Sequence, residues 1–90
     1  MNKTEMIDRI ARTADISKAA AERALDATVG TIKAELRKGE SVSLVGFGTF
    51  YPTRRAARTM RNPRTQEPIE VKAISVPRFR PGKALKDALN

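Results

Sequence analysis

The residues best suited to chemistry lie in the segment TRRAARTMRNPRT, residues 53–65, which carries five arginines. A guanidinium group is always charged at neutral pH, and its planar fork of N–H donors matches a phosphate. Alanine and threonine separate the arginines, so an extended ribbon built from this segment would be slim enough for a groove about 6 Å wide. The charges could instead only protect a sheet edge against aggregation, but such protection does not need arginine in particular. The pattern favours binding of phosphates along a groove.

Pro63 stands among these arginines and permits two interpretations. In the first, Asn62-Pro63-Arg64-Thr65 forms a type I turn, because Asn-Pro is a frequent turn dipeptide and proline suits the second position of that turn. In the second, a rigid apolar ring at the tip of a cationic ribbon acts as a wedge that enters between stacked base pairs from the minor groove. The two interpretations are compatible.

Composition argues against enzymatic chemistry. The 90 residues contain no cysteine and no histidine, so a disulfide, a thiolate metal site and the commonest general base are all absent. The ten carboxylates are scattered among eighteen Lys and Arg residues, which leave a net charge of +8 and a pI near 10.6. We expect no catalytic residue, no metal and no cofactor. The expected partner is a polyanion.

Two helices are predicted within the first 38 residues. The first has Asn2 as its N-cap and Glu5 three positions later, a capping-box pattern, and Ser17 can cap the second. The second helix should end before Gly39, a residue type that commonly follows a helix C-terminus. Its apolar stripe consists of Ala21, Leu25, Thr28, Val29, Ile32 and Leu36.

The periodicity changes after residue 40. Residues 42–50 predict two short strands that meet at the turn Gly46-Phe47-Gly48, and Ile69–Val76 alternates like the returning strand of a long hairpin. The tip of that hairpin should lie within Asn62–Pro68. A short helix led by Pro81 and Gly82 closes the chain. The predicted class is α+β, with two N-terminal helices, an antiparallel sheet that carries a long protruding β-ribbon arm, and a short C-terminal helix.

The predicted arm leaves a small body. If about twenty residues project, only about 65 to 70 remain, and domains of that size are marginal alone. The stripe of the second helix and the three phenylalanines, Phe47, Phe50 and Phe79, then need a partner surface. Because two-fold dimers are the commonest closed assembly, we expect an intertwined homodimer with two arms.

The chain has no apolar run near the roughly 20 residues needed to span a bilayer. Its start, MNKTEMIDRI, is interrupted by charges where a signal peptide would carry an apolar stretch of about 7 to 15 residues. We therefore expect no membrane partner and a cytoplasmic location.

Several segments carry a resemblance to a known family over nearly the whole chain. They are MNKTEMIDRIARTADISKAAAERALDA, LVGFGTF, RAARTMRNPRT and VPRFRPGKALKDALN. In this order and spacing the chain resembles the bacterial histone-like HU proteins, of the HU and integration host factor family, which are established examples of the minor-groove wedge. The resemblance implies a single DNA-binding domain over residues 1–90, located at the nucleoid. Residues 1–52 and 75–90 would form a dimerisation body with a β saddle, and residues 53–74 the arm. A heterodimer with a paralogue stays open.

The resemblance also implies which residues touch double-stranded DNA. In the arm these are Arg55, Arg58, Arg61, Asn62, Pro63, Arg64, Thr65 and Lys72. On the saddle and flanks they are Gly46 and Gly48, through their backbone amides, and Lys3, Arg78, Arg80, Lys83 and Lys86. For the last five, plain solvated surface charge is the alternative.

The chain departs from the family at the tip. Met60 and Gln66 stand where the family commonly has glycine, and Gln adopts a left-handed turn conformation only at a cost of about 1 kcal/mol. Met60 is either an added apolar contact in the minor groove or a shielded side chain on the ribbon. Pro68 adds a second ring at the start of the returning strand.

The leading function is architectural: largely sequence-independent binding, bending and compaction of double-stranded DNA, with the arms in the minor groove and Pro63 as the wedge. The alternative is a sequence-preferring bending protein like integration host factor, which would select deformable DNA steps. Binding of RNA or single strands usually needs exposed aromatic side chains, for which Tyr51 is the one candidate. A module that only dimerises would leave the arm unexplained.

Overall fold

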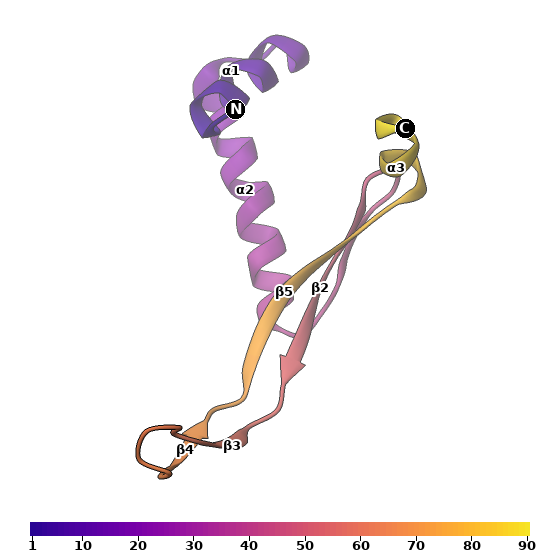
Figure 1. The fold of residues 1–90 in the computed structure, drawn as a ribbon. Coiled ribbons are helices and arrows are strands. Elements are labelled where there is room, and N and C mark those ends of the chain that lie inside the picture. Colours follow the sequence, from indigo (N-terminus) through magenta and orange to yellow (C-terminus); the bar gives the residue numbers. More distant parts are fainter. The chain divides into compact units, whose positions relative to one another are not determined.

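The computed structural model describes residues 1–90, which form two compact units, Met1–Ala34 and Glu35–Asn90. The first unit holds helix α1, Lys3–Ala14, and most of helix α2, Lys18–Arg37. The second holds the end of α2, all five strands and helix α3, Lys83–Leu89 (Figure 1). No helix is both long and apolar enough to cross a membrane.

The ends of α1 and α2 follow the predicted capping residues. The side chain of Asn2 accepts a hydrogen bond from the Glu5 amide at 2.9 Å, and Ser17 Oγ accepts one from the Ala20 amide at 3.0 Å. At the far end of α2, Gly39 takes the left-handed conformation with φ 85, and its amide donates to the carbonyl of Leu36. The two helices that the sequence predicted are therefore confirmed, together with the glycine that ends the second.

The strands of the second unit form an antiparallel three-stranded sheet in the order β1-β2-β5 and a two-stranded sheet of β3 and β4. Their bounds are β1 Val42–Leu44, β2 Gly48–Arg55, β3 Arg58–Arg61, β4 Pro68–Val71 and β5 Ile74–Pro81. The predicted α+β class with a long β-ribbon is confirmed. The predicted returning strand Ile69–Val76 is wrong in its bounds, because β4 and β5 are separated at residues 72–73 and β5 continues to Pro81.

The turn between β1 and β2 explains why position 46 is a glycine. The Phe47 amide donates to the carbonyl of Leu44 at 2.9 Å, which closes a four-residue turn with Gly46 in its third position. Gly46 has φ 84, a value that favours glycine there. The turn thus directs Phe47 back toward the sheet, where its ring lies 5.2 Å from that of Phe79.

The chain by itself has almost no core. Its buried hydrophobic residues are Ala11 and Ala21, both small. Phe79 also contacts Phe50, at 4.8 Å between ring centroids, yet Phe47 and Phe79 remain 43% and 38% exposed. The phenylalanines that the sequence predicted as core residues therefore form a cluster that one chain leaves open. A considerable apolar surface remains uncovered in each unit.

Candidate nucleic-acid interface

The longest structural feature of the second unit is a ribbon of two antiparallel segments, residues 48–61 and 68–81, which we call the ribbon. Arg55 lies opposite Ile74 and Arg58 opposite Val71, so two residues separate these pairs on each strand and neither strand has an insertion. One register therefore runs from Gly48 at the base to Arg61 beside the tip. The ladder is interrupted at residues 56–57 and 72–73, which leaves two unpaired residues on each strand between the two sheets.

This register gives the sheet two chemically different faces. The face that we call the polar face carries Thr49, Tyr51 and Thr53 of β2 and Arg78 and Arg80 of β5. The opposite face carries Phe50, Pro52, Pro77 and Phe79 and then, nearer the tip, Arg54 opposite Ser75. Period-two alternation thus holds the phenylalanine cluster on one side of the sheet and Arg78 and Arg80 on the other.

The tip, Asn62–Glu67, is closed by its own hydrogen bonds. The Gln66 amide donates to the carbonyl of Asn62 at 2.8 Å, and the Asn62 amide donates to the carbonyl of Glu67 at 2.9 Å. The Asn62 side chain also accepts from the Arg64 amide at 2.9 Å. Pro63 is exposed within this loop.

The tip differs in one respect from the sequence prediction. We expected a four-residue type I turn over residues 62–65, but the closing hydrogen bond comes from Gln66, one residue later. Gln66 takes φ 63, the left-handed conformation that we expected to cost a glutamine about 1 kcal/mol. This conformation carries the chain from the turn into the returning strand, so the loop is one residue wider than predicted.

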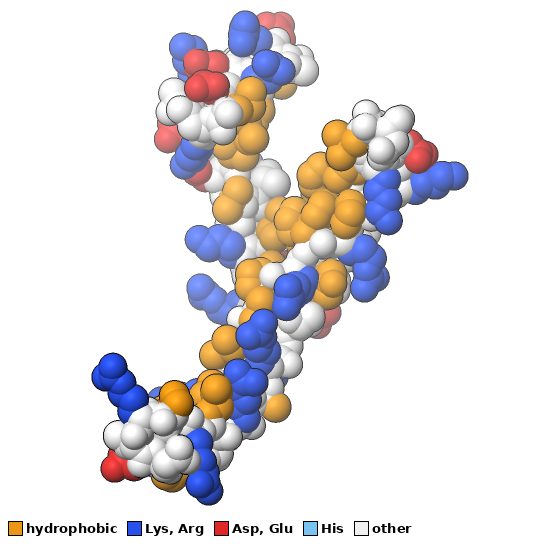
Figure 2. Space-filling view, in the orientation of Figure 1, with side chains coloured by type: hydrophobic (Ala, Val, Ile, Leu, Met, Phe, Trp, Pro, Cys, Tyr) orange, Lys and Arg blue, Asp and Glu red, His pale blue; other side chains and the backbone are white.

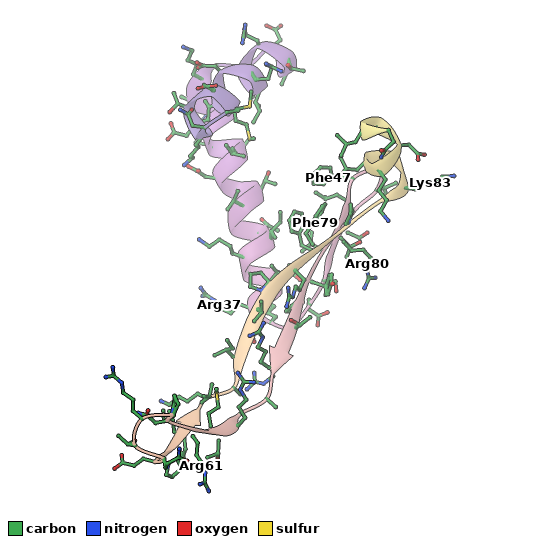
Figure 3. All side chains as sticks on the ribbon, in the orientation of Figure 1. Arg37, Phe47, Arg61, Phe79, Arg80 and Lys83 are labelled. Carbon is green, nitrogen blue, oxygen red and sulfur yellow. The ribbon has the colours of Figure 1, made fainter.

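The basic side chains of the arm are exposed and have no ion-pair partner in the chain. Figure 2 shows Lys and Arg side chains along the length of the ribbon, and Figure 3 shows Arg61 beside the tip. The five predicted cations are Arg55, Arg58, Arg61, Arg64 and Lys72. The ribbon thus brings them together as an unneutralised row, which is the requirement for binding a phosphate backbone.

A hollow of about 410 Å³ lies where the ladder is interrupted. Its lining consists of the cations Arg55, Arg58 and Lys72 and the apolar residues Ala56, Ala57, Val71 and Ile74. Because alanine fills little space, three cationic side chains border an open concavity in the middle of the arm. Such a concavity can accept an anionic group.

Met60 lies opposite Ile69 in the register of β3 and β4, and each side chain is 46% exposed. The pair forms a small apolar area next to the tip. This area is compatible with both interpretations of Met60, contact with a groove or mutual shielding on the ribbon. Glu70, opposite Thr59, is an acid on the other face of the same two strands.

The predicted saddle cations lie near the base of the ribbon. Arg80 and Lys83 are at the end of the ribbon away from the tip, as are Phe47 and Phe79 (Figure 3). Lys83 is the first residue of α3 and Lys86 lies in its last turn. Gly82 precedes α3, and its amide donates to the carbonyl of Phe47 at 2.8 Å, which ties the helix start to the β1–β2 turn.

Gly48 has a packing role that the sequence did not reveal. It is buried, and a Cβ atom built on it would come within 2.5 Å of the Phe79 ring and 2.6 Å of the Arg80 carbonyl oxygen. Only glycine fits at this crossing of β2 and β5. Its predicted contact to DNA through the backbone amide stays a prediction.

Lys3 belongs to the other unit and is already paired. Its Nζ lies 2.8 Å from a carboxylate oxygen of Asp26 on α2. The hydrogen bond and negative charge of Asp26 raise the pKa of Lys3 above its usual value. Among the predicted flank cations, Lys3 therefore differs in having an internal partner.

Two groups of residues were missed from sequence. Arg37, Lys38 and Arg54 border a hollow of about 330 Å³ within the second unit, and none was predicted as a site residue. On the polar face, the guanidinium of Arg80 lies over the ring of Tyr51, 5.0 Å from its centroid. Neither group leaves a local pattern in the sequence, because the first joins a helix end to a strand and the second joins β2 to β5 across the sheet.

Comparison with known proteins finds matches over the whole chain. The family model of the bacterial DNA-binding proteins matches residues 1–90. DNA-binding protein HU-beta of Escherichia coli K12 is 59% identical over 90 residues, which is all of both chains. DNA-binding protein HU of Neisseria meningitidis serogroup B is 58% identical over 89 residues, 99% of this chain and all of the relative.

Solved structures agree with this assignment. The Anabaena HU–DNA cocrystal structure matches with a TM-score of 0.84 and 40% identity, over 99% of this chain and 97% of that one. HU from Thermotoga maritima matches with a TM-score of 0.72 and 37% identity over all of both chains.

Proposed function

This chain belongs to the HU family of bacterial DNA-binding proteins, and we propose that it binds, bends and compacts double-stranded DNA with little regard to sequence. Binding of this ligand would locate the protein at the nucleoid, within the cytoplasm. The Anabaena relative is a protein solved together with DNA, which supports a duplex as the ligand. The family supplies the general role, and the residues of this chain supply the mechanism below.

The observation that carries the proposal is the row of unpaired cations on a two-stranded ribbon with an exposed proline at its tip. Two strands have the width to enter a minor groove, and guanidinium groups on both faces can reach the phosphates on its walls. Such contacts carry no base code, because the phosphates are the same at every step. We therefore propose binding that depends on charge and DNA deformability.

We propose that each predicted site residue has one of four roles. Pro63 is the wedge, while Asn62 and Thr65 hold the tip in shape through their side chains, which accept from the Arg64 and Glu67 amides. The cations neutralise phosphates along the arm and flanks, and the backbone at Gly46 and Gly48 meets the duplex at the saddle. The phosphate contacts are Lys3, Arg55, Arg58, Arg61, Arg64, Lys72, Arg78, Arg80, Lys83 and Lys86.

We propose that kinking the duplex offsets the cost of unstacking bases by adding contacts to phosphates. Insertion of the Pro63 ring unstacks a base step at a cost of a few kcal/mol, and the resulting bend brings more phosphates within reach of the arm and flank cations. Proline suits this position because its ring is rigid and apolar and its nitrogen carries no hydrogen that would be left unpaired. The arm cations supply the affinity for the duplex, and the Pro63 ring at the tip sets the position of the bend.

We propose that the functional unit is an intertwined homodimer with two such arms. The support is the lack of any large buried side chain in one chain, together with the half-exposed phenylalanine cluster. A second copy that presents the same surfaces would cover this cluster and the apolar side of α2. The predicted boundaries follow from this, with residues 1–52 and 75–90 in the dimer body and residues 53–74 in the arm. A paralogue could take the place of the second copy.

The test is a titration against intact, nicked and random-sequence duplexes at several salt concentrations. If roughly 6 to 10 phosphates are neutralised per dimer, the slope of log K against log salt should be about −5 to −9. A slope near −1 would reject arms that follow the groove. Equal affinities for unrelated sequences are expected, whereas strong preference for one duplex sequence would support the alternative, a bending protein like integration host factor.

A further inference from the structure

Tyr51 lies on the polar face beside the two arginines of β5. It is directly opposite Arg78 in the register, and the guanidinium of Arg80 lies over its ring at 5.0 Å from the centroid. The diagonal relation of Tyr51 and Arg80 is one in which aromatic and long side chains reach each other across a sheet. The two arginines therefore have different relations to the ring, Arg78 as the directly opposite residue and Arg80 as the diagonal one over the ring.

Arg80 has no other side-chain partner in the chain, neither a carboxylate nor a hydrogen-bond acceptor. A cation–π contact uses the face of the aromatic ring and consumes none of the N–H donors of the guanidinium. The ring limits the rotamers of a long side chain while the donors stay free. Arg80 is thus restrained and still able to bind an anion.

We propose that Tyr51 is a positioning residue that holds Arg80 on the polar face, in a geometry that binds a DNA phosphate. The inference rests on the proposed function and assigns Tyr51 a part in it that the sequence did not indicate. Restraining a flexible side chain before binding reduces the conformational entropy lost when it meets its ligand. Tyr51 acts through Arg80 and does not itself touch the duplex.

The geometry also separates this role from base stacking. A stacking platform needs an open aromatic face, but Tyr51 is only partly exposed and Arg80 lies over its ring. A base would have to displace Arg80 before it could stack. Binding of single strands through Tyr51 is therefore disfavoured relative to positioning of the arginine.

The experiment is a double-mutant cycle on binding of an intact duplex by the full-length protein. Tyr51→Leu keeps apolar bulk without the π face, and Tyr51→Phe keeps the ring. We expect Tyr51→Leu to weaken binding by about twofold to fivefold per protomer, and Tyr51→Phe to retain the affinity of the parent. In an Arg80→Ala background the loss from Tyr51→Leu should vanish, while in an Arg78→Ala background it should persist.

A spectroscopic measurement gives an independent readout. Tyr51 is the one tyrosine and there is no tryptophan, so intrinsic fluorescence reports on this ring alone. Arg80→Ala should change the tyrosine emission of the free protein, whereas Arg78→Ala should leave it nearly unchanged. Unfolding midpoints of the Tyr51 variants are compared at equal concentration, so that a loss of fold is recognised.

The outcomes separate two failures. If the parent does not bind duplex DNA, the proposed function falls. If Arg80→Ala weakens binding but Tyr51→Leu does not, or if its loss is the same in the Arg80→Ala background, the proposed function stands and the positioning role is wrong.

Discussion

At the scale of single residues, Pro63 and Gly48 show how differently two small or rigid residue types are used. Pro63 is exposed in a loop whose closing hydrogen bonds come from the amides of Asn62 and Gln66, so its ring makes none of the contacts that close the loop. Gly48 is buried between the Phe79 ring and the Arg80 carbonyl. We therefore expect substitution of Pro63 to alter function and substitution of Gly48 to alter stability.

Changing Pro63 to Ala should leave assembly and affinity at high protein load largely intact while it reduces DNA bending and the preference for nicked duplexes. The measurement is ring closure of a DNA fragment shorter than about 150 base pairs, which circularises poorly without a bending protein. Pro68→Ala is the matched control, because Pro68 lies opposite Arg61 in the ladder and outside the tip. If the Pro63 variant promotes closure as well as the parent at equal occupancy, Pro63 is a turn residue only.

Changing Gly48 to Ala should destabilise the fold by about 1 to 3 kcal/mol, since one of the contacting atoms is a backbone carbonyl that cannot rotate away. Denaturant unfolding at fixed protein concentration measures the change. A variant as stable as the parent would show that β2 and β5 separate easily, contrary to the packing described above.

At the scale of elements, the ribbon carries cations on both of its faces, so it can reach the phosphates on both walls of a groove. Arg58 and Arg61 fall on opposite faces of β3 by strand alternation. Changing both to Ala should weaken binding to every duplex and lower the salt slope by about one unit per lost phosphate contact. Arg9→Ala with Arg12→Ala on α1 removes the same charge outside the proposed site. An equal loss from this control pair would mean that net charge alone, without the arm, explains the affinity.

The elements themselves were largely predictable from sequence, because their signals are local. Caps at Asn2 and Ser17 and the left-handed Gly39 each depend on residues within one or two turns. The interruption of the returning strand and the wider tip were missed, since pairing depends on the opposite strand and on the conformation of Gln66. The contact of Tyr51 with Arg80 joins residues 29 positions apart in the sequence, and no local pattern encodes such a distance.

At the scale of the whole molecule, the chain presents more apolar surface than it buries. Phe47 is 43% exposed, and its ring contacts one other aromatic ring, that of Phe79. If a second copy covers this cluster, folding and association become one process. The apparent stability of the protein would then depend on its concentration.

Changing Phe47 to Ala should cost about 3 to 5 kcal/mol if a partner buries the ring, and much less if the ring stays half exposed. Unfolding and dissociation should occur together in sedimentation and thermal experiments, with midpoints that fall on dilution. Val45→Ala, in the same turn and fully exposed, should change little. A stable, folded monomer of the Phe47 variant would contradict the shared core.

The single register of the ribbon also limits how its length can change. A residue inserted in one strand alone would leave the pairing beyond it out of step and turn every following side chain to the other face. One residue added to each strand would restore the pairing. The side chains between the insertion and the tip would still point to the opposite face from before. Only additions of two residues per strand preserve both, and each lengthens the ribbon by about 6.6 Å. Arms of this design should therefore grow or shrink in steps of four residues, during evolution as well as in engineering.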